Sequence, residues 1–326
     1  MNELIGPIVT MFVSLATLLI SSNIAIKNAV KISEITGLGK SRIGFTFVAT
    51  STSLPELAVA LFASVSGEAA VSVGNVLGSN VANICLIIGL GVILYTLKSE
   101  ELATAKFKPD ELDTLYLGIF TASIIPTLLI SFLPASRIVG FLLIIIYVYQ
   151  TYKIITKKEL PLEETEEDAK SDSKKLMIYV LLAFLGIIGV VLSADFLVDS
   201  TVKLALLIGI PSSVLSATIV AVGTSFPELS LDIQAMLKDH VTLAFGDVIG
   251  SCFTNITLIL GITLLFSPVR INIRIFSDLI TFSILANIVL WYLMHRGNLG
   301  WKEGLYLLLL YGLFIASIMG ILVFPD

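Results

Sequence analysis

The sequence has little charge and few of the side chains that serve soluble catalytic sites. Only 14% of its 326 residues are Asp, Glu, Lys or Arg, against about 25% in a typical soluble domain. It contains two cysteines and two histidines. Cys85 and Cys252 both lie inside apolar segments, so no disulfide framework is predicted. His240 and His295 lie at segment ends, which argues against histidine chemistry inside those segments.

Long hydrophobic runs take the place of charge. The chain is 56% hydrophobic, with a mean hydropathy of +0.98. Apolar runs of about 20 residues recur, long enough for a helix to cross a bilayer. We therefore predict an all-α polytopic membrane protein whose first run is a retained span, since residues 1–3 carry no positive charge. Ten spans are predicted, at about residues 4–26, 41–66, 70–96, 113–133, 138–155, 176–198, 212–236, 242–266, 276–294 and 303–324.

The distribution of Lys and Arg predicts the orientation of these spans, because cytoplasmic loops carry the excess of positive charge. With the N-terminus outside, sixteen of the 20 Lys and Arg residues fall on the cytoplasmic side and four fall outside. The interpretation is a multi-pass protein of the cell membrane with both termini outside. The longest polar loop, residues 156–175, mixes lysines with acidic residues and is interpreted as a solvated linker; a cation-sensing role is the alternative.

A polar motif occurs twice in this apolar chain, with a constant offset of 172 residues. Residues 49–56 read ATSTSLPE and residues 74–83 read GNVLGSNVAN. Their counterparts, residues 221–228 and 246–255, read AVGTSFPE and GDVIGSCFTN. Residues 44–83 align with residues 216–255 without a gap, and 14 of these 40 positions are identical.

Five spans in each half, an odd number, would insert the second half upside down relative to the first. We therefore predict two inverted five-helix repeats, residues 1–155 and 176–326, joined by the linker at 156–175. Inverted repeats are typical of secondary transporters, whose binding sites form near the midplane where the repeats meet.

Two glutamates in the motifs are the main candidates for a binding site. Glu56 and Glu228 fall well inside predicted spans, where a carboxylate is costly and usually serves an ion or proton pathway. No Lys or Arg occurs in residues 43–97 or 204–237, which disfavours a structural ion pair. The prolines before them, Pro55 and Pro227, each remove an N–H from the helix ladder and free carbonyl groups to line a cavity.

The other candidate ligands of the motifs are backbone, hydroxyl and amide oxygens. They are Ala49, Thr52, Ser53, Ser79 and Asn83 in the first motif, and Ala221, Thr224, Ser225, Ser251 and Asn255 in the second. These hard oxygens suit calcium and sodium better than magnesium, which keeps its waters. A bond from any one hydroxyl to its own helix is the alternative. The glycine pairs of both motifs, four residues apart, also predict close helix packing.

The two motifs resemble the α-repeats of the sodium/calcium exchanger family, of prokaryotic or archaeal type, within the cation/calcium exchanger superfamily. The resemblance implies a secondary antiporter that exchanges sodium for calcium by alternating access, and not an enzyme. Glu56 and Glu228 would bind calcium with the backbone oxygens of Thr52 and Thr224. The same groups would share the sodium sites with Ala49, Ser53, Ser79, Ala221, Ser225 and Ser251. Asn83 and Asn255 would complete the centre, and the first and sixth spans would slide against the other eight.

The same resemblance implies the partners and the coupling. Calcium and sodium would be transported substrates, with no organic cofactor, no nucleic acid, membrane lipid around the chain and a functional monomer. Three sodium ions per calcium, the count the family implies, would make exchange electrogenic. Asn255 stands where potassium-dependent relatives have Asp, which argues for potassium independence. Ser79 and Ser251 occupy the region where the proton-coupled branch has Glu, so a proton/calcium antiporter is the alternative.

Two further carboxylates have no counterpart in the first motif. Asp232 lies one helical turn beyond Glu228, where the first repeat has Ala60, and Asp247 stands opposite Asn75. Both are interpreted as candidate residues of an access path. An intramembrane aspartyl protease would use the same pair but leaves the duplicated glutamates unexplained, and a channel would pass ions without a counter-ion.

Overall fold

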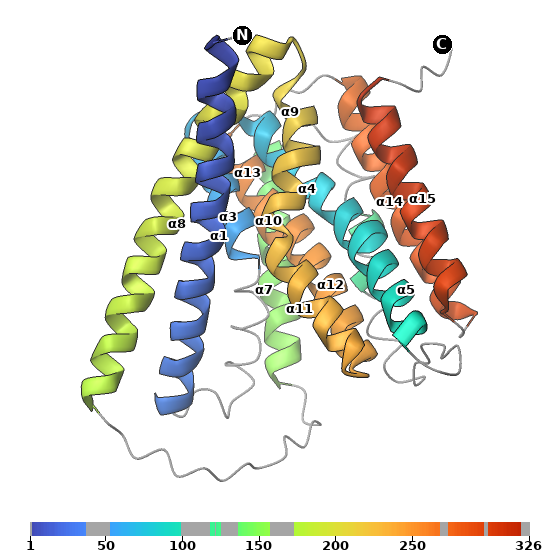
Figure 1. The fold of residues 1–326 in the computed structure, drawn as a ribbon, viewed down its shortest axis with the longest axis horizontal. Helices are drawn as coiled ribbons and strands as arrows, with labels where there is room; N and C mark the ends of the chain where they lie inside the picture. The colour runs from blue at the N-terminus through green and yellow to red at the C-terminus, as the bar shows by residue number, and fades with distance from the viewer. Residues whose placement is uncertain are drawn as a thin grey trace.

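The computed structural model describes residues 2–36, 53–98, 118–120, 122–124, 136–156, 173–267, 273–296 and 299–320. Within these ranges the chain is helical and forms no β-sheet (Figure 1). Six of the described helices are long and apolar enough to cross a membrane, and a seventh span results if one bent pair of helices is counted together. The all-α, membrane-spanning part of the prediction is confirmed. Much of the predicted spans 41–66 and 113–133 lies outside the described residues.

The described helices follow one another in this order, with η denoting π-helical turns. The first half contains α1 (Asn2–Thr36), α3 (Leu54–Val65), α4 (Ala69–Val81), η2 (Ala82–Ile88), α5 (Gly89–Lys98) and α7 (Ser136–Thr156). The second half contains α8 (Ser173–Ile208), α9 (Ser212–Leu215), η4 (Ser216–Val220), α10 (Ala221–Thr224), α11 (Phe226–Leu237), α12 (Val241–Thr254), η5 (Asn255–Ile259), α13 (Leu260–Phe266), α14 (Ile273–His295) and α15 (Trp301–Ile318).

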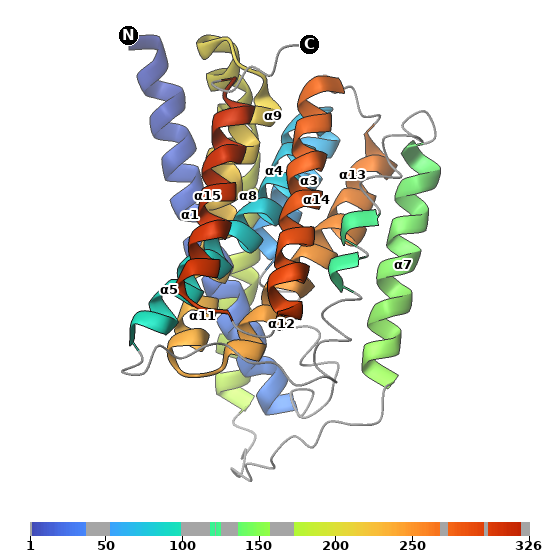
Figure 2. The ribbon, with the colours of Figure 1, turned by 90° about the vertical axis from the view of Figure 1, so that its right-hand side faces the viewer.

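Helices α1 and α8 lie side by side and run in opposite directions (Figures 1 and 2). They have 35 and 36 residues, so both continue well past the predicted ends at residues 26 and 198. At 1.5 Å per residue each is about 52 Å long, against about 30 Å for the hydrocarbon core. The prediction ended each span where its apolar run ends, but the helix continues into polar turns. In α8 such a turn holds the Lys203–Asp199 ion pair, with an N–O distance of 2.6 Å.

The 172-residue repeat is also present in the backbone. Helices α3 and α11 have the same length, and both of their ends differ by 172 positions. Their N-cap residues have nearly the same dihedral angles, φ −81° and ψ 15° at Ser53 and φ −80° and ψ 11° at Ser225. Helices α4 and α12 begin at Ala69 and Val241, again 172 apart. The two motifs therefore adopt one local structure.

The motif helices occupy the centre of the bundle. In the most apolar stretches of Ala69–Lys98 and Val241–Phe266, 83% and 72% of residues are buried, against 28% for α1 and 22% for α8. Helices of opposite halves also interlock: α5 packs on α15 and α13 packs on α7. A Cβ added at Gly89 would lie 3.1 Å from the Gly304 carbonyl oxygen, and one added at Gly261 would lie 3.0 Å from that of Gly140.

The beginning of α1 and the end of α15 lie at the same end of the molecule (Figure 1). An even number of membrane crossings requires this arrangement.

Candidate ion-binding site

Glu56 and Glu228 lie in the first turns of α3 and α11, two short helices whose N-cap residues are Ser53 and Ser225. Each residue is 1% exposed, and their carboxylates are close enough to interact electrostatically. The partial positive charge of a helix N-terminus stabilises a carboxylate there. The Ser225 hydroxyl donates a hydrogen bond of 3.2 Å to Glu56 Oε1. This bond joins the second motif to the first, so both motifs contribute to one site.

Six buried oxygens of the predicted ligands have no hydrogen-bond partner within the described part of the chain. They are Oε2 of Glu56 and Glu228, Oγ of Ser53 and Ser251, and Oδ1 of Asn83 and Asn255. Leaving such a group unpaired costs about 1–3 kcal/mol, and proteins keep few of them. Carboxylate, hydroxyl and amide oxygens are the ligands that hard cations take. The residues present therefore fit calcium or sodium as a transported substrate.

The remaining predicted ligands that the structure describes have hydrogen-bond partners within the protein. The Ala221 carbonyl accepts hydrogen bonds from the Ser225 N–H at 3.1 Å, the Thr224 hydroxyl at 3.3 Å and the Ser79 hydroxyl at 3.4 Å. The Thr224 hydroxyl also donates to Asn75 Oδ1 at 3.1 Å. Ser79 and Ser225 therefore bond across the two motifs, whereas their counterparts Ser251 and Ser53 have unpartnered hydroxyls. The predicted ligands Ala49 and Thr52 lie outside the described residues.

The helices are interrupted at the site. The predicted span 212–236 is broken between α10 and α11, which meet at an angle of 48°. Pro227 lies in the first turn of α11, where its missing N–H costs no helical hydrogen bond. Asn83 lies in the π-helical segment η2, and Asn255 begins η5. Such π-helical turns are frequent at functional sites, and the periodicity of apolar residues contained no signal for them.

Two asparagines that the prediction did not include also lie at the site. Asn75 and Asn80 are fully buried, and Asn75 holds the Thr224 hydroxyl. The Asn80 amide donates to the Cys252 carbonyl at 3.4 Å, and its Oδ1 accepts the Asn255 amide at 3.1 Å. Asn80 and Cys252 are equivalent positions, 172 apart, so they meet across the axis that relates the two motifs. One indication of their importance was present in the sequence: position 80 is Asn and position 252 is Cys, although the Gly-Ser pair before each is the same.

Asp232 and Asp247 come together next to the site. Asp232 is 2% exposed, and Asp247 is partly buried on the neighbouring helix α12. Their carboxyl groups are close enough to interact electrostatically, and each has a buried Oδ2 with no hydrogen-bond partner among the described residues. Both act electrostatically on Glu228. Among the described residues, no group of three or more His, Cys, Asp or Glu side chains is placed to hold a metal ion, so hydroxyl and amide oxygens are needed beside the glutamates.

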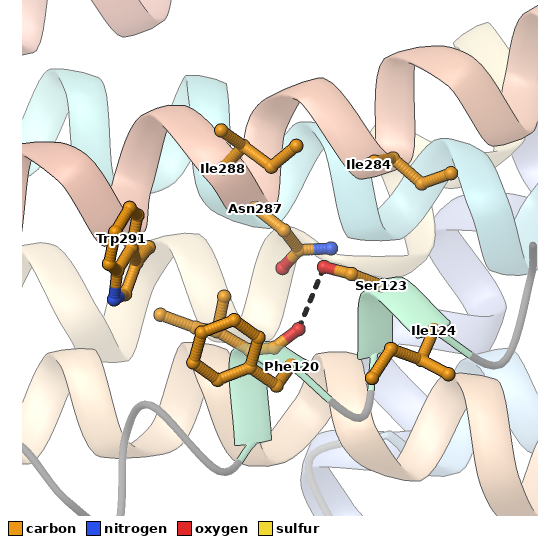
Figure 3. Close-up of a pocket in the computed structure, with 8 residues that line it drawn as sticks. Phe120, Ser123, Ile124, Ile284, Asn287, Ile288 and Trp291 are labelled. Carbon is orange, nitrogen blue, oxygen red and sulfur yellow. Dashed lines mark hydrogen bonds between the residues drawn. The ribbon is translucent and has the colours of Figure 1, made fainter.

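A cavity of about 310 Å³ lies apart from these residues, between residues 119–124 and α14 (Figure 3). It is lined by Ile119, Phe120, Ser123, Ile124, Ile284, Asn287, Ile288 and Trp291. Its lining is mostly apolar. The Ser123 hydroxyl donates to the Ile119 carbonyl at 2.8 Å, and the Asn287 amide donates to the Ser283 carbonyl at 2.9 Å. It contains none of the predicted ligands.

A family model described as sodium/calcium exchanger protein matches residues 6–156 and 178–320. The chain belongs to the sodium/calcium exchanger family. The two matches of the family model begin 172 residues apart (178 − 6), the same offset as the motifs.

Relatives of known sequence support this assignment. The sodium/calcium exchanger MaX1 of Methanosarcina acetivorans is 30% identical over 350 aligned positions, covering 94% of this chain and 96% of the relative. The uncharacterized membrane protein MJ0091 of Methanocaldococcus jannaschii is 30% identical over 276 positions, covering 85% of this chain and 86% of the relative.

Solved structures share the fold. The sodium-calcium exchanger NCX_Mj matches with a TM-score of 0.62 and 24% identity, covering 96% of this chain and 99% of that one. A structure of the H+/Ca2+ exchanger CAX matches with a TM-score of 0.74 and 18% identity, covering 98% and 82%. These two likenesses show that the chain has the fold of the solved exchangers.

Proposed function

We propose that this exchanger is an antiporter that moves calcium in exchange for sodium across the cell membrane by alternating access. The observation that carries the proposal is the pair of buried glutamates from opposite motifs with unpartnered oxygens around them. One calcium ion, or several sodium ions, would neutralise the two carboxylates. Moving the site empty would carry a charge of −2 through a poorly hydrated state, which is costly. Loaded transit is favoured, and that preference is the physical basis of exchange.

The proposed architecture is ten spans in two inverted repeats, residues 1–155 and 176–326, with the linker 156–175 on the cytoplasmic side. Two observations support the inverted repeats. The bounds of α3 and α11 are both offset by 172 residues, and α1 and α8 run in opposite directions. The excess of Lys and Arg on one side of the predicted spans supports termini outside the cell. The candidate ligands of both motifs belong to one chain, which supports a functional monomer.

The proposed coupling is three sodium ions per calcium, without potassium. This ratio moves one net positive charge per cycle, worth about 2.3 kcal/mol per 100 mV of membrane potential. The amide of Asn255 offers an oxygen but no third fixed negative charge, so a cotransported potassium ion would have no charge to balance it. Asp232 and Asp247 would line the access path one turn from Glu228.

A proton/calcium antiporter is the second candidate, because two carboxyl groups near Glu228, those of Asp232 and Asp247, each have a buried oxygen without a partner among the described residues. Two neighbouring carboxyl groups can form a hydrogen bond with each other when one of them carries a proton. In this candidate function the pair would carry the coupling ion.

Calcium uptake into proteoliposomes distinguishes the two candidates. Purified protein is reconstituted into sodium-loaded vesicles, which are diluted into sodium-free buffer. We expect uptake to require internal sodium and to be indifferent to a potassium gradient alone. An interior-positive potential, set with external potassium and valinomycin, should accelerate uptake, because three sodium ions leave for each calcium that enters. Uptake driven equally by an outward proton gradient without sodium would replace the proposal with the proton-coupled alternative.

A further inference from the structure

The asparagine that bridges the two motifs, Asn80, bonds to the second motif away from its glutamate. It is fully buried near the end of α4, one position after the predicted ligand Ser79. Its side-chain contacts are with the junction of α12 and η5: Nδ2 donates to the Cys252 carbonyl at 3.4 Å and Oδ1 accepts Asn255 Nδ2 at 3.1 Å. The Cys252 carbonyl also accepts the backbone N–H of Asn255. One side chain therefore holds the amide of Asn255 and also the carbonyl to which the Asn255 backbone N–H is bonded.

These bonds determine which end of the Asn255 amide is available to a cation. A side-chain amide has an oxygen that accepts and a nitrogen that donates, and a half-turn exchanges them. A cation is bound only by the oxygen. Because Asn80 Oδ1 holds the nitrogen of Asn255, the oxygen is directed away from Asn80. That oxygen is 1 of the six unpartnered oxygens of the site, although Asn255 is only 1% exposed.

The orientation of Asn80 is determined in turn by the Cys252 carbonyl. A carbonyl only accepts, so it selects the nitrogen of Asn80 and leaves Asn80 Oδ1 facing Asn255. Two hydrogen bonds thus connect the Cys252 carbonyl of the second repeat to the Asn80 side chain of the first, and Asn80 in turn to the Asn255 amide of the second. The reverse chain does not exist at the equivalent position, because Cys252 has a thiol where Asn80 has an amide. Its Sγ lies 3.9 Å from the Asn80 carbonyl oxygen.

We infer that Asn80 is a positioning residue that fixes the Asn255 amide with its oxygen toward the ion site and thereby sets calcium affinity. The inference rests on the proposed function, in which calcium binds between the two motifs. Without Asn80, the Asn255 nitrogen loses its acceptor, and the amide is free to turn its N–H groups toward the cation. Replacing such an outer partner of a metal ligand typically weakens metal affinity by about 10–100-fold.

The test is a double-mutant cycle on calcium binding to the purified, detergent-solubilised protein, measured by titration calorimetry and by vesicle exchange. Asn80→Ala and Asn80→Leu remove both bonds, and Leu preserves the side-chain volume. Each should weaken calcium binding by about tenfold. In the Asn255→Asp background the same two substitutions should change calcium affinity by about twofold or less, because a carboxylate presents an oxygen in either orientation. The control is Ser283→Ala, which removes a buried hydroxyl that has no hydrogen-bond partner among the described residues. This variant should bind calcium like the wild type.

Three other results have defined meanings. An equal loss in the Asn255 and Asn255→Asp backgrounds would show that Asn80 acts on the fold and would overturn the inference. Unchanged affinity in both Asn80 variants would also overturn it. Wild-type protein that binds no calcium would overturn the proposed function and the inference with it, whereas binding without sodium-dependent exchange would reject only the coupling.

Discussion

At the scale of single residues, the two glutamates carry the charge on which the proposed exchange depends. Glu56→Gln and Glu228→Gln each preserve shape and remove one negative charge. Calcium would then face a single carboxylate, so we expect each variant to lose calcium exchange. The measurement is isotopic calcium-for-calcium exchange in proteoliposomes, with a thermal unfolding curve for each variant to establish that it is folded. Exchange at the wild-type rate in either variant would mean that the site is elsewhere.

Asp232 has a different expected role because it lies one turn beyond Glu228, near Asp247. We expect Asp232→Asn to weaken apparent calcium affinity from the cytoplasmic side while leaving maximal turnover near that of the wild type. Removing its charge makes the access path less attractive to cations without altering a ligand. The measurement is the calcium dependence of exchange in vesicles of known orientation, with Asp199→Asn, an exposed residue, as the control. A complete loss of turnover would make Asp232 a direct ligand.

At the scale of elements, the glycines of α4 set how closely it packs on the segment α9–η4. A Cβ added at Gly78 would lie 2.6 Å from the Cα of Ala217 and 2.8 Å from its carbonyl carbon. These are backbone atoms, so one of the two helices would have to shift. We expect Gly78→Ala to destabilise the protein by about 1–3 kcal/mol, more than the helix propensity that alanine contributes. The measurement is the thermal midpoint in detergent.

The matched control is Gly6→Ala on α1, where the structure places nothing within 4 Å of the added Cβ. This variant should unfold at the wild-type temperature or slightly above it. Equal midpoints for Gly78→Ala and the wild type would show that the contact between α4 and η4 adjusts without cost.

The elements also show what the sequence could predict. The repeat offset predicted that the two motifs share one local structure, and α3 and α11 agree at both ends. The glutamates and the amide oxygens of Asn83 and Asn255 could be predicted as candidate ligands, because they are polar residues deep inside apolar spans. The break before α11 and the π-helical segments did not, because they depend on hydrogen bonds rather than on apolar periodicity. The bonds of Ser225 to Glu56 and of Asn255 to Asn80 join residues 169 and 175 apart in sequence, so only the folded chain reveals them.

At the scale of the whole molecule, the buried residues form two clusters. One contains buried residues of α1, α3 and α8, together with Val71 of α4 and with Leu215 and Val220 of the segment that leads to the site. The other is formed mainly by α4, η2, α12, α13, α14 and α15, and it also includes residues of α3, α5, α7, α9, η4 and α11. The long contact of α1 with α8 belongs to the first cluster, at the periphery of the bundle. We expect α1 and α8 to move together along the central helices, as the resemblance of the motifs to the exchanger family implies.

A cross-link between α1 and α8 tests whether the two helices move as one unit. A Cβ added at Gly189 lies 2.8 Å from the Ser21 Cβ, so cysteines at these two positions are close enough to form a disulfide after a small separation. We expect the oxidised Ser21→Cys, Gly189→Cys variant to retain sodium-dependent calcium exchange, since the bond joins parts that slide together. The single-cysteine variants are the controls, because the native Cys85 and Cys252 are buried. Loss of exchange on oxidation, restored by reduction, would show that α1 and α8 must separate or slip past each other during transport.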